Sequence, residues 1–115
     1  MKLMIDDANI ERIKEIYEYY PVDGVTTNPS ILAKRKRSPY DVLKEIREFI
    51  GDEAELHVQA VSGDAHGIAE EAHKIVKELG KNTYVKIPAV PEGFKAMQEL
   101  KDDGTFDNIK DTWFK

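Results

Sequence analysis

Cysteine is absent from the 115 residues of this chain. A disulfide framework, a thiolate nucleophile and a cysteine metal site are therefore excluded, and a reducing, cytoplasmic setting is expected. Basic residues are also in the minority, because 17 Lys and Arg face 22 Asp and Glu and the formal net charge is -5. Sequence-independent binding to nucleic acid depends on basic side chains that neutralise phosphates. The charge balance therefore predicts no nucleic-acid partner.

Long apolar runs are missing as well. The amino terminus reaches Asp6 and Asp7 before a signal-peptide core could form, and no later run approaches about 18 apolar residues. We therefore expect neither secretion nor association with a membrane. Hydrophobic residues make up 41% of the chain and charged residues of both signs 34%, a composition that predicts one modest folded domain.

Short extended runs alternate with amphipathic helical patterns as far as about residue 103. Strands are predicted at residues 3–5, 22–26, 56–61 and 84–87. The helices between them are bounded by capping and breaking residues: Asn9 to Pro21, Ser38 and Pro39 to Gly51, Ser62 or Asp64 to Gly80, and Pro91 to Gly104. Four consecutive βα units without a hairpin signal predict an α/β fold with a parallel sheet, over residues 1–104. The tail, residues 105–115, is predicted as neither strand nor helix.

The two faces of the predicted strands differ in polarity, since side chains alternate across a strand. One face is apolar and suited to helix packing. The other face carries polar groups near the carboxyl ends of the strands: Asp6, Thr26, Asn28, His57, Gln59 and Lys86. Ligand sites of parallel α/β folds form at this end of the sheet. The turn after the first strand, residues 6–9, has no glycine, so a dinucleotide site is not expected.

Lys86 lies between Val85 and Ile87 in a strand that is otherwise apolar. Desolvation lowers the pKa of a lysine, and a neutral amine can attack a carbonyl to form a Schiff base. The alternative is structural, because a lysine on an edge strand commonly protects against aggregation.

The remaining polar groups also have two interpretations each. Asp6 is either a helix cap or a carboxylate that moves protons in the site. Asn28, before Pro29, is either a turn residue or, with Thr26, a donor to a sugar chain. Gln59 either holds a substrate hydroxyl or is an interior amide satisfied by its neighbours.

Three other features have predominantly structural interpretations. His66 and His73 are separated by about 10 Å along one helix, which is too far for one metal ion, so no metal site is expected. His57 points into the predicted site but has a core or polar-layer role as its main interpretation. The basic run 34–37 is expected to be a solvated loop, with contact to an anionic substrate as the alternative.

Several of these residues occur together in a known family. The opening strand that ends in Asp6, the run 24–31 (GVTTNPSI), Gln59, and the run 85–88 (VKIP) followed by Glu92 and Gly93 resemble the small transaldolases and fructose-6-phosphate aldolases. The resemblance implies a TIM (β/α)8 barrel and a class I mechanism without a cofactor. It also implies Lys86 as the Schiff-base lysine and Asp6 as the proton-handling carboxylate, with Thr26 and Asn28 among the substrate contacts. Glutamine at position 59 resembles the aldolase branch more than the transaldolase branch.

The resemblance covers roughly residues 1–104, which is four of eight βα units. Four parallel strands cannot close a barrel, so we expect self-association to complete or cover this half. Three hypotheses follow. The chain is a Schiff-base aldolase or transaldolase acting on the dihydroxyacetone unit of a ketose phosphate. Alternatively, it is a truncated half-barrel with weak activity or none, or a protein that binds a sugar phosphate without chemistry.

Overall fold

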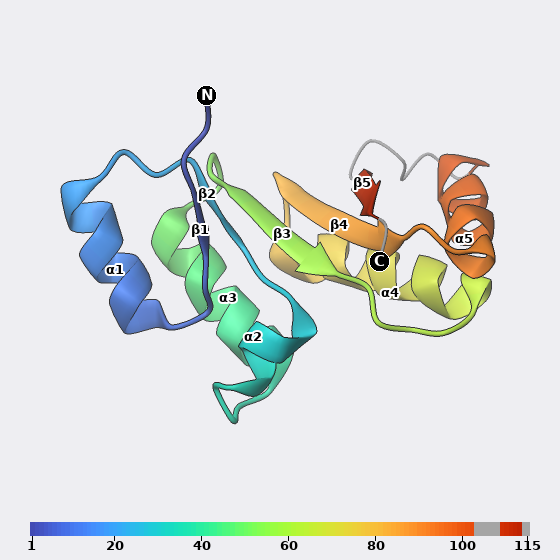
Figure 1. The fold of residues 1–115 in the computed structure, drawn as a ribbon, viewed down its shortest axis with the longest axis horizontal. Helices are drawn as coiled ribbons and strands as arrows, with labels where there is room; N and C mark the ends of the chain where they lie inside the picture. The colour runs from blue at the N-terminus through green and yellow to red at the C-terminus, as the bar shows by residue number, and fades with distance from the viewer. Residues whose placement is uncertain (103–108, 114–115) are drawn as a thin grey trace.

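The computed structural model describes residues 1–102 and 109–113. Strands and helices alternate along the chain (Figure 1). The strands are β1 (Met4–Asp6), β2 (Gly24–Thr26), β3 (Glu55–Gln59), β4 (Thr83–Pro88) and β5 (Ile109–Trp113). The helices are α1 (Ile10–Tyr19), α2 (Pro29–Ala33), α3 (Pro39–Ile50), α4 (Ala65–Leu79) and α5 (Pro91–Asp102). The predicted succession of four βα units is therefore confirmed.

All five strands belong to one parallel sheet in the order β1-β2-β3-β4-β5. Each strand is followed by a helix that returns the chain to the start of the next strand, which is the connection that parallel neighbours require. Because the order in space equals the order in sequence, the carboxyl ends of all the strands lie at one edge of the sheet, as Figure 1 shows.

Two elements were not predicted from the sequence. Helix α2 forms directly after β2, where the pattern indicated a turn and a helix entry at Asn28 and Pro29 but no separate helix, and the basic run begins at its end. Strand β5 lies in the tail and pairs with β4, with an irregularity in register between Val85 and Lys86. The other tail residues, 105–108 and 114–115, lie outside the described part of the chain, as does Gly104, the predicted helix end.

Local signals explain where the helices begin and end. The side-chain oxygens of Asn9, Asn28 and Asp64 accept hydrogen bonds from the first-turn amides of α1, α2 and α4. Ser38 precedes Pro39 as predicted, but its side chain makes no capping hydrogen bond. Gly51 and Gly80 follow α3 and α4 with φ of 83° and 78°, a backbone conformation that favours glycine.

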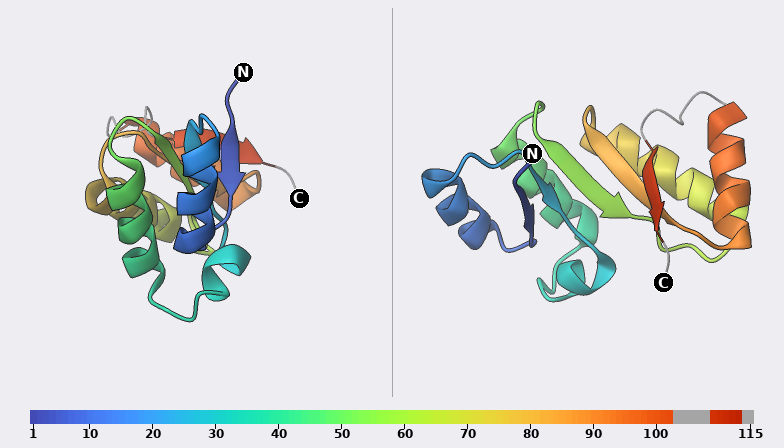
Figure 2. Two further views of the ribbon diagram at one scale, coloured as in Figure 1. Left: turned by 90° about the vertical axis from the view of Figure 1, so that its left-hand side faces the viewer. Right: turned by 45° about the horizontal axis from the view of Figure 1, so that its top comes forward.

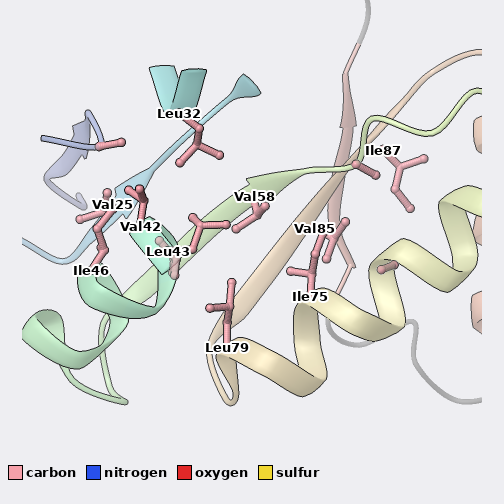
Figure 3. Close-up of a cluster of buried hydrophobic side chains, with 14 of the residues drawn as sticks. Val25, Leu32, Val42, Leu43, Ile46, Val58, Ile75, Leu79, Val85 and Ile87 are labelled. Carbon is pink, nitrogen blue, oxygen red and sulfur yellow. The ribbon is translucent and has the colours of Figure 1, made fainter. Parts of the chain in front are cut away.

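Helices cover one face of the sheet, and no described helix covers the other (Figures 1 and 2). The covered face packs as predicted, because Ile5, Val25, Leu56, Val58, Val85 and Ile87 are all buried. Figure 3 shows side chains of α2, α3 and α4 meeting Val25, Val58 and Val85 between the layers. Some residues on the apolar faces of the sequence pattern are nevertheless exposed, among them Leu3 at 43% and Phe94 at 51%. Leu3 precedes β1, and Phe94 projects from the first turn of α5.

A buried arginine joins the two central βα units at the amino-terminal end of the sheet. Arg47 of α3 is 8% exposed, and all five of its N–H groups have acceptors. The acceptors lie in the segments that follow α3 and α4: the carbonyl oxygens of Leu79, Gly51, Ala54 and Asn82, at 2.7–3.0 Å, and Oγ1 of Thr83, at 2.9 Å. Burial lowers the pKa of this guanidinium, but the positive charge lies against the carbonyl ends of two helices, where a cation is favoured.

Candidate functional site

The strand register arranges the polar face in two rows. Asp6, Thr26, His57 and Tyr84 are successive register partners on β1 to β4 and form the first row. Gln59 and Lys86 are partners in the next row, nearer the carboxyl ends of the strands. Parity therefore predicted the correct face for each of these side chains, and the uncovered face of the sheet is the one that carries them.

Asp6 and Thr26 form the first contact within the site. The hydroxyl of Thr26 donates to Oδ1 of Asp6 over 2.8 Å, so it fixes one carboxylate oxygen and leaves the other available. Asp6 itself is exposed. The helix-capping alternative for Asp6 does not hold for α1, because the side chain of Asn9 caps this helix. The neighbouring carboxylate of Asp7 accepts from the amides of Ala8 and Asn9.

Asn28 has a clear structural task. Its Oδ1 accepts from the amide of Ile31 at 2.9 Å and caps α2. The carboxamide nitrogen of the same group is a donor that capping does not use. Pro29 follows at the first helical position, where the missing N–H costs no hydrogen bond. The turn and helix-entry interpretation is thus correct for the oxygen, and the contact with substrate stays a prediction for the nitrogen.

Lys86 and Gln59 lie side by side on the central strands. Both are half-buried, and the amide of Ala60 donates to the carbonyl of Lys86 at 3.0 Å, which continues the β3–β4 pairing past the end of β3. Because β4 has β3 on one side and β5 on the other, Lys86 is not on an edge strand. The structural alternative for this lysine, a gatekeeper on a sheet edge, is therefore wrong.

The start of α5, the helix that follows β4, packs closely against the end of β4. A side chain on Gly93 would place a Cβ atom 1.9 Å from the carbonyl oxygen of Pro88, so only glycine fits there. The neighbouring Glu92 accepts through Oε2 from the amide of Ala65 at 2.9 Å, and this bond lowers the pKa of its carboxyl. Glu92 and Gly93 therefore fix the β4–α5 turn beside Lys86 and tie it to the start of α4.

A second polar layer lies below the candidate site, and only part of it was predicted. His57 is buried, its Nε2–H donates to the carboxylate Oε1 of Glu55 at 2.9 Å, and its ring lies 5.1 Å from that of Tyr84. Lys2 forms an ion pair with Oε2 of Glu55, and this contact is the main reason why the pKa of Glu55 is lowered. The polar-layer interpretation of His57 is correct. Glu55 was missed, although it shares the parity of His57 and Gln59.

Metal binding receives no support from this geometry. In residues 1–102 and 109–113, no cluster of three or more His, Asp or Glu side chains could hold an ion. His66 instead bridges two carboxylates of α4 and α5, Glu70 at 2.9 Å and Glu99 at 3.3 Å, and they raise its pKa.

The proposed acid and nucleophile stand three strands apart. At a spacing of about 4.8 Å, β1 and β4 would be separated by roughly 14 Å in a flat sheet. Within the described residues no hydrogen bond joins the pair Asp6 and Thr26 to the pair Gln59 and Lys86. The two pairs can act on one small molecule only if the sheet curves so that its polar face is concave, as in a barrel.

Parallel strands of this order, with a lysine and a carboxylate on the inner face, agree with the family suggested by the sequence. The model of the family "Transaldolase/Fructose-6-phosphate aldolase" matches residues 3–109. The chain belongs to this family. Its fold is accordingly an α/β half-barrel, built from the amino-terminal strands and helices.

Similar proteins include both branches of the family. A probable fructose-6-phosphate aldolase of Streptococcus pneumoniae is 41% identical over 106 residues, which are 90% of this chain and 47% of the relative. Probable transaldolases of Methanococcus maripaludis and Aquifex aeolicus are 40% and 41% identical over 109 residues, 95% of this chain and 49% of each relative. The chain thus spans about half the length of the curated relatives it matches. Overall identity does not separate aldolase from transaldolase. No described helix has the length and apolar character needed to cross a bilayer.

Proposed function

We propose that this chain carries the Schiff-base half of a class I aldolase or transaldolase site, acting on the dihydroxyacetone unit of a ketose phosphate such as fructose 6-phosphate. The observation that supports it best is the position of Lys86, half-buried on an inner strand of the uncovered polar face. Gln59 lies beside it, and Asp6 and Thr26 share the same face. Family membership supports the same chemistry.

The chemistry needs only side chains, with no cofactor. Nζ of Lys86 attacks the substrate carbonyl carbon and forms a carbinolamine, which loses one water to give an iminium. The hydroxyl on the carbon β to the iminium carbon loses its proton, the bond between the α and β carbons breaks, and the electron pair of that bond passes to the iminium, so that an aldehyde leaves and an enamine stays on Lys86. In the aldolase reaction, protonation of the enamine at carbon and addition of one water then release dihydroxyacetone and the free amine. Asp6 transfers protons during gain and loss of water, and its hydrogen bond with Thr26 orients it. Thr26, Asn28 and Gln59 supply donors for substrate hydroxyls.

Completion of the site requires cover for the open face, and we assign that role to self-association. Strand β1 pairs only with β2 among the described strands, so its other side offers free backbone groups. Beside it lies a groove of about 450 Å³ lined by Leu3, Met4, Ile5, Asp6, Asp7, Ile16 and Tyr20. Light scattering over a range of concentrations tests this, and a well-folded monomer at every concentration would contradict it. The chemistry proposed here is that of a cytoplasmic sugar-phosphate enzyme.

Borohydride trapping tests the chemical proposal directly. The protein is incubated with dihydroxyacetone or fructose 6-phosphate, the imine is reduced to a stable secondary amine, and the adduct is located by intact mass and peptide mapping. We expect an adduct on Lys86 alone, none in Lys86→Ala, and slower formation in Asp6→Asn. The matched control Lys81→Ala removes an exposed lysine at the opposite end of β4 and should leave the yield unchanged.

The second candidate function is a half-barrel that folds by association but does not turn over substrate. The separation of Asp6 from Lys86 by three strands favours it, because proton transfer needs direct or water-mediated contact. An adduct on Lys86 without release of product would select this candidate. Absence of any adduct, together with a saturable rise in melting temperature on adding the sugar phosphate, would select binding without chemistry.

A further inference from the structure

An apolar pocket lies on the helix-covered side of the sheet, and it includes neither Lys86 nor Asp6. It has a volume of about 380 Å³ and is enclosed by α2, α3, α4 and the carboxyl end of β3. Its principal apolar lining residues are Leu32, Tyr40, Leu43, Val58, Val61 and Ile75. Figure 3 shows Leu32, Leu43, Val58 and Ile75 projecting into the space between these elements.

Chain parity separates this pocket from the Schiff-base site. Val58 faces the helices, whereas Lys86 projects from the opposite face of the same sheet; of the residues assigned to the Schiff-base site, Gln59 at the end of β3 also lines the pocket. A ligand in the pocket would therefore contact neither Lys86 nor Asp6. The lining is also too apolar for a polyhydroxylated sugar, whose hydroxyls would lose their hydrogen bonds to water.

Polar groups occur at the margin of the pocket. Glu71 lines it, but its carboxylate already accepts from the amides of Val61 and Ser62 at 2.9–3.0 Å. Tyr40 is half-buried, and Nζ of Lys74 lies 4.6 Å from the centre of its ring. Glu71 is thus held to its own backbone by these amides, and Lys74 places a positive charge at the same margin.

The basic run 34–37 adds to that positive charge. It connects Ala33 to Pro39 through Ser38, and both Ala33 and Pro39 line the pocket, so chain connectivity holds the run at the rim. Lys34 and Lys36 are exposed, and neither forms an ion pair within the described residues, whereas Arg37 pairs with Glu45 at 3.1 Å. Nε of Arg35 is buried without a hydrogen-bond partner. Lys36 has a φ of 55°, an uncommon conformation for this residue type.

We propose that this pocket binds a small amphiphilic organic anion, with its apolar body between α3 and α4 and its anionic head at the basic run. The volume is that of a small-molecule site, the lining is mostly apolar, and Lys34 and Lys36 of the basic run lie at the rim without an ion-pair partner among the described residues, which is the combination that such a ligand requires. The basic run thereby has a binding role. The pocket shares Gln59 with the proposed aldolase site but includes neither Lys86 nor Asp6.

Naphthalene-2-sulfonate serves as the probe, and the uncharged naphthalene-2-sulfonamide of the same shape is its control. Each is titrated into the labelled full chain, and binding is followed through the amide and methyl NMR signals. We expect saturable shifts confined to Tyr40, Leu43, Val58, Val61 and Ile75, with the sulfonate bound at least about fivefold more tightly than the sulfonamide. Salt at about 0.5 M should remove most of that difference, because it screens exposed charges.

Two variants test the two parts of the pocket. Lys34→Gln with Lys36→Asn removes two rim charges, and asparagine tolerates the positive φ at position 36. This double variant should bind the sulfonate no more tightly than the sulfonamide. The control double variant, Lys81→Gln with Lys95→Gln, should still bind the sulfonate more tightly than the sulfonamide. Ala33→Trp, at an exposed lining position, should abolish binding of both probes.

Three results would overturn the proposal. Equal affinity of the two probes for the unaltered protein would show that the anionic group of the ligand contributes nothing to binding. Shifts centred on Lys86, Thr26 and Asp6 would place the probe in the sugar site instead. Shifts at the pocket residues that appear without a probe when protein concentration rises would show that a second copy of the chain occupies it.

Discussion

Replacement of Arg47 by methionine is expected to be the most damaging single change away from the candidate site. The side chain is 8% exposed and holds the carbonyl oxygens of Leu79, Gly51, Ala54 and Asn82 together with the hydroxyl of Thr83. Methionine keeps much of the volume but donates no hydrogen bond. The four carbonyl oxygens would then lose a charged partner at the point where α3 and α4 return to the sheet.

The size of the effect follows from those contacts. A hydrogen bond to a charged group contributes about 1.5–3 kcal/mol, and a buried polar atom left without a partner costs about 1–3 kcal/mol. These contributions are not additive, and water can reach some of the freed carbonyls, so we expect Arg47→Met to lower the free energy of unfolding by about 3–5 kcal/mol. Lysine has three donors for five acceptors, so Arg47→Lys should lose about half as much.

Urea unfolding followed by far-ultraviolet circular dichroism measures the change. Arg12→Met is the matched control, because Arg12 is exposed and its one ion-pair partner is Asp7. The midpoint of Arg12→Met should stay close to that of the unaltered protein. If Arg47→Met unfolds at the same urea concentration as Arg12→Met, with an unchanged slope, the buried guanidinium does not stabilise this fold and the reasoning is wrong.

Three further perturbations have defined outcomes. Gly93→Ala should destabilise the chain by about 1–3 kcal/mol, because its Cβ would overlap the carbonyl of Pro88, whereas Gly63→Ala has open space and should be tolerated in the same thermal melts. Asn9→Ala should cost about 1 kcal/mol through the lost cap of α1, and Ser38→Ala, which loses no capping bond, should be near neutral; equal effects would contradict the assignment of the caps. The pKa of Glu55 is lowered first by its hydrogen bond with Lys2, so its stabilisation is present above the ordinary carboxyl pKa and is lost as pH falls through the lowered value. Glu55→Gln should therefore show a smaller loss of stability on acidification than the unaltered protein, and parallel pH profiles would show that this ion pair contributes nothing.

The strand faces could be predicted because their period is fixed by the backbone. A residue two positions along a strand returns to the same face whatever its neighbours are, so Thr26, Gln59 and Lys86 were placed correctly from parity alone. The helix limits at Asn9, Gly51 and Gly80 were likewise readable, because capping chemistry depends on residue type within one turn.

The features that were missed depend on neighbours distant in sequence. Strand β5 carries polar residues along much of its length, and only its pairing with β4 makes it a strand. The position of Arg47 was one indication, since it lies four residues after Leu43 on the apolar stripe of α3, but four of its five acceptors are backbone carbonyls that no residue pattern reveals. The ion pair of Lys2 with Glu55 links residues 53 positions apart, across β2.

The two groups assigned to catalysis are held to very different degrees. Lys86 lies in a strand with a neighbour on each side and beside a turn fixed by Glu92 and Gly93. Asp6 ends a strand of three residues that has one neighbour among the described strands, and within the described residues it is held by Thr26. The proposed nucleophile is therefore held in place by this chain, whereas the proposed acid depends on the segment that pairs with the free edge of β1. Carbinolamine formation should accordingly be less sensitive to closure of the sheet than the proton transfers that complete a turnover, because those require Asp6 to approach across three strands.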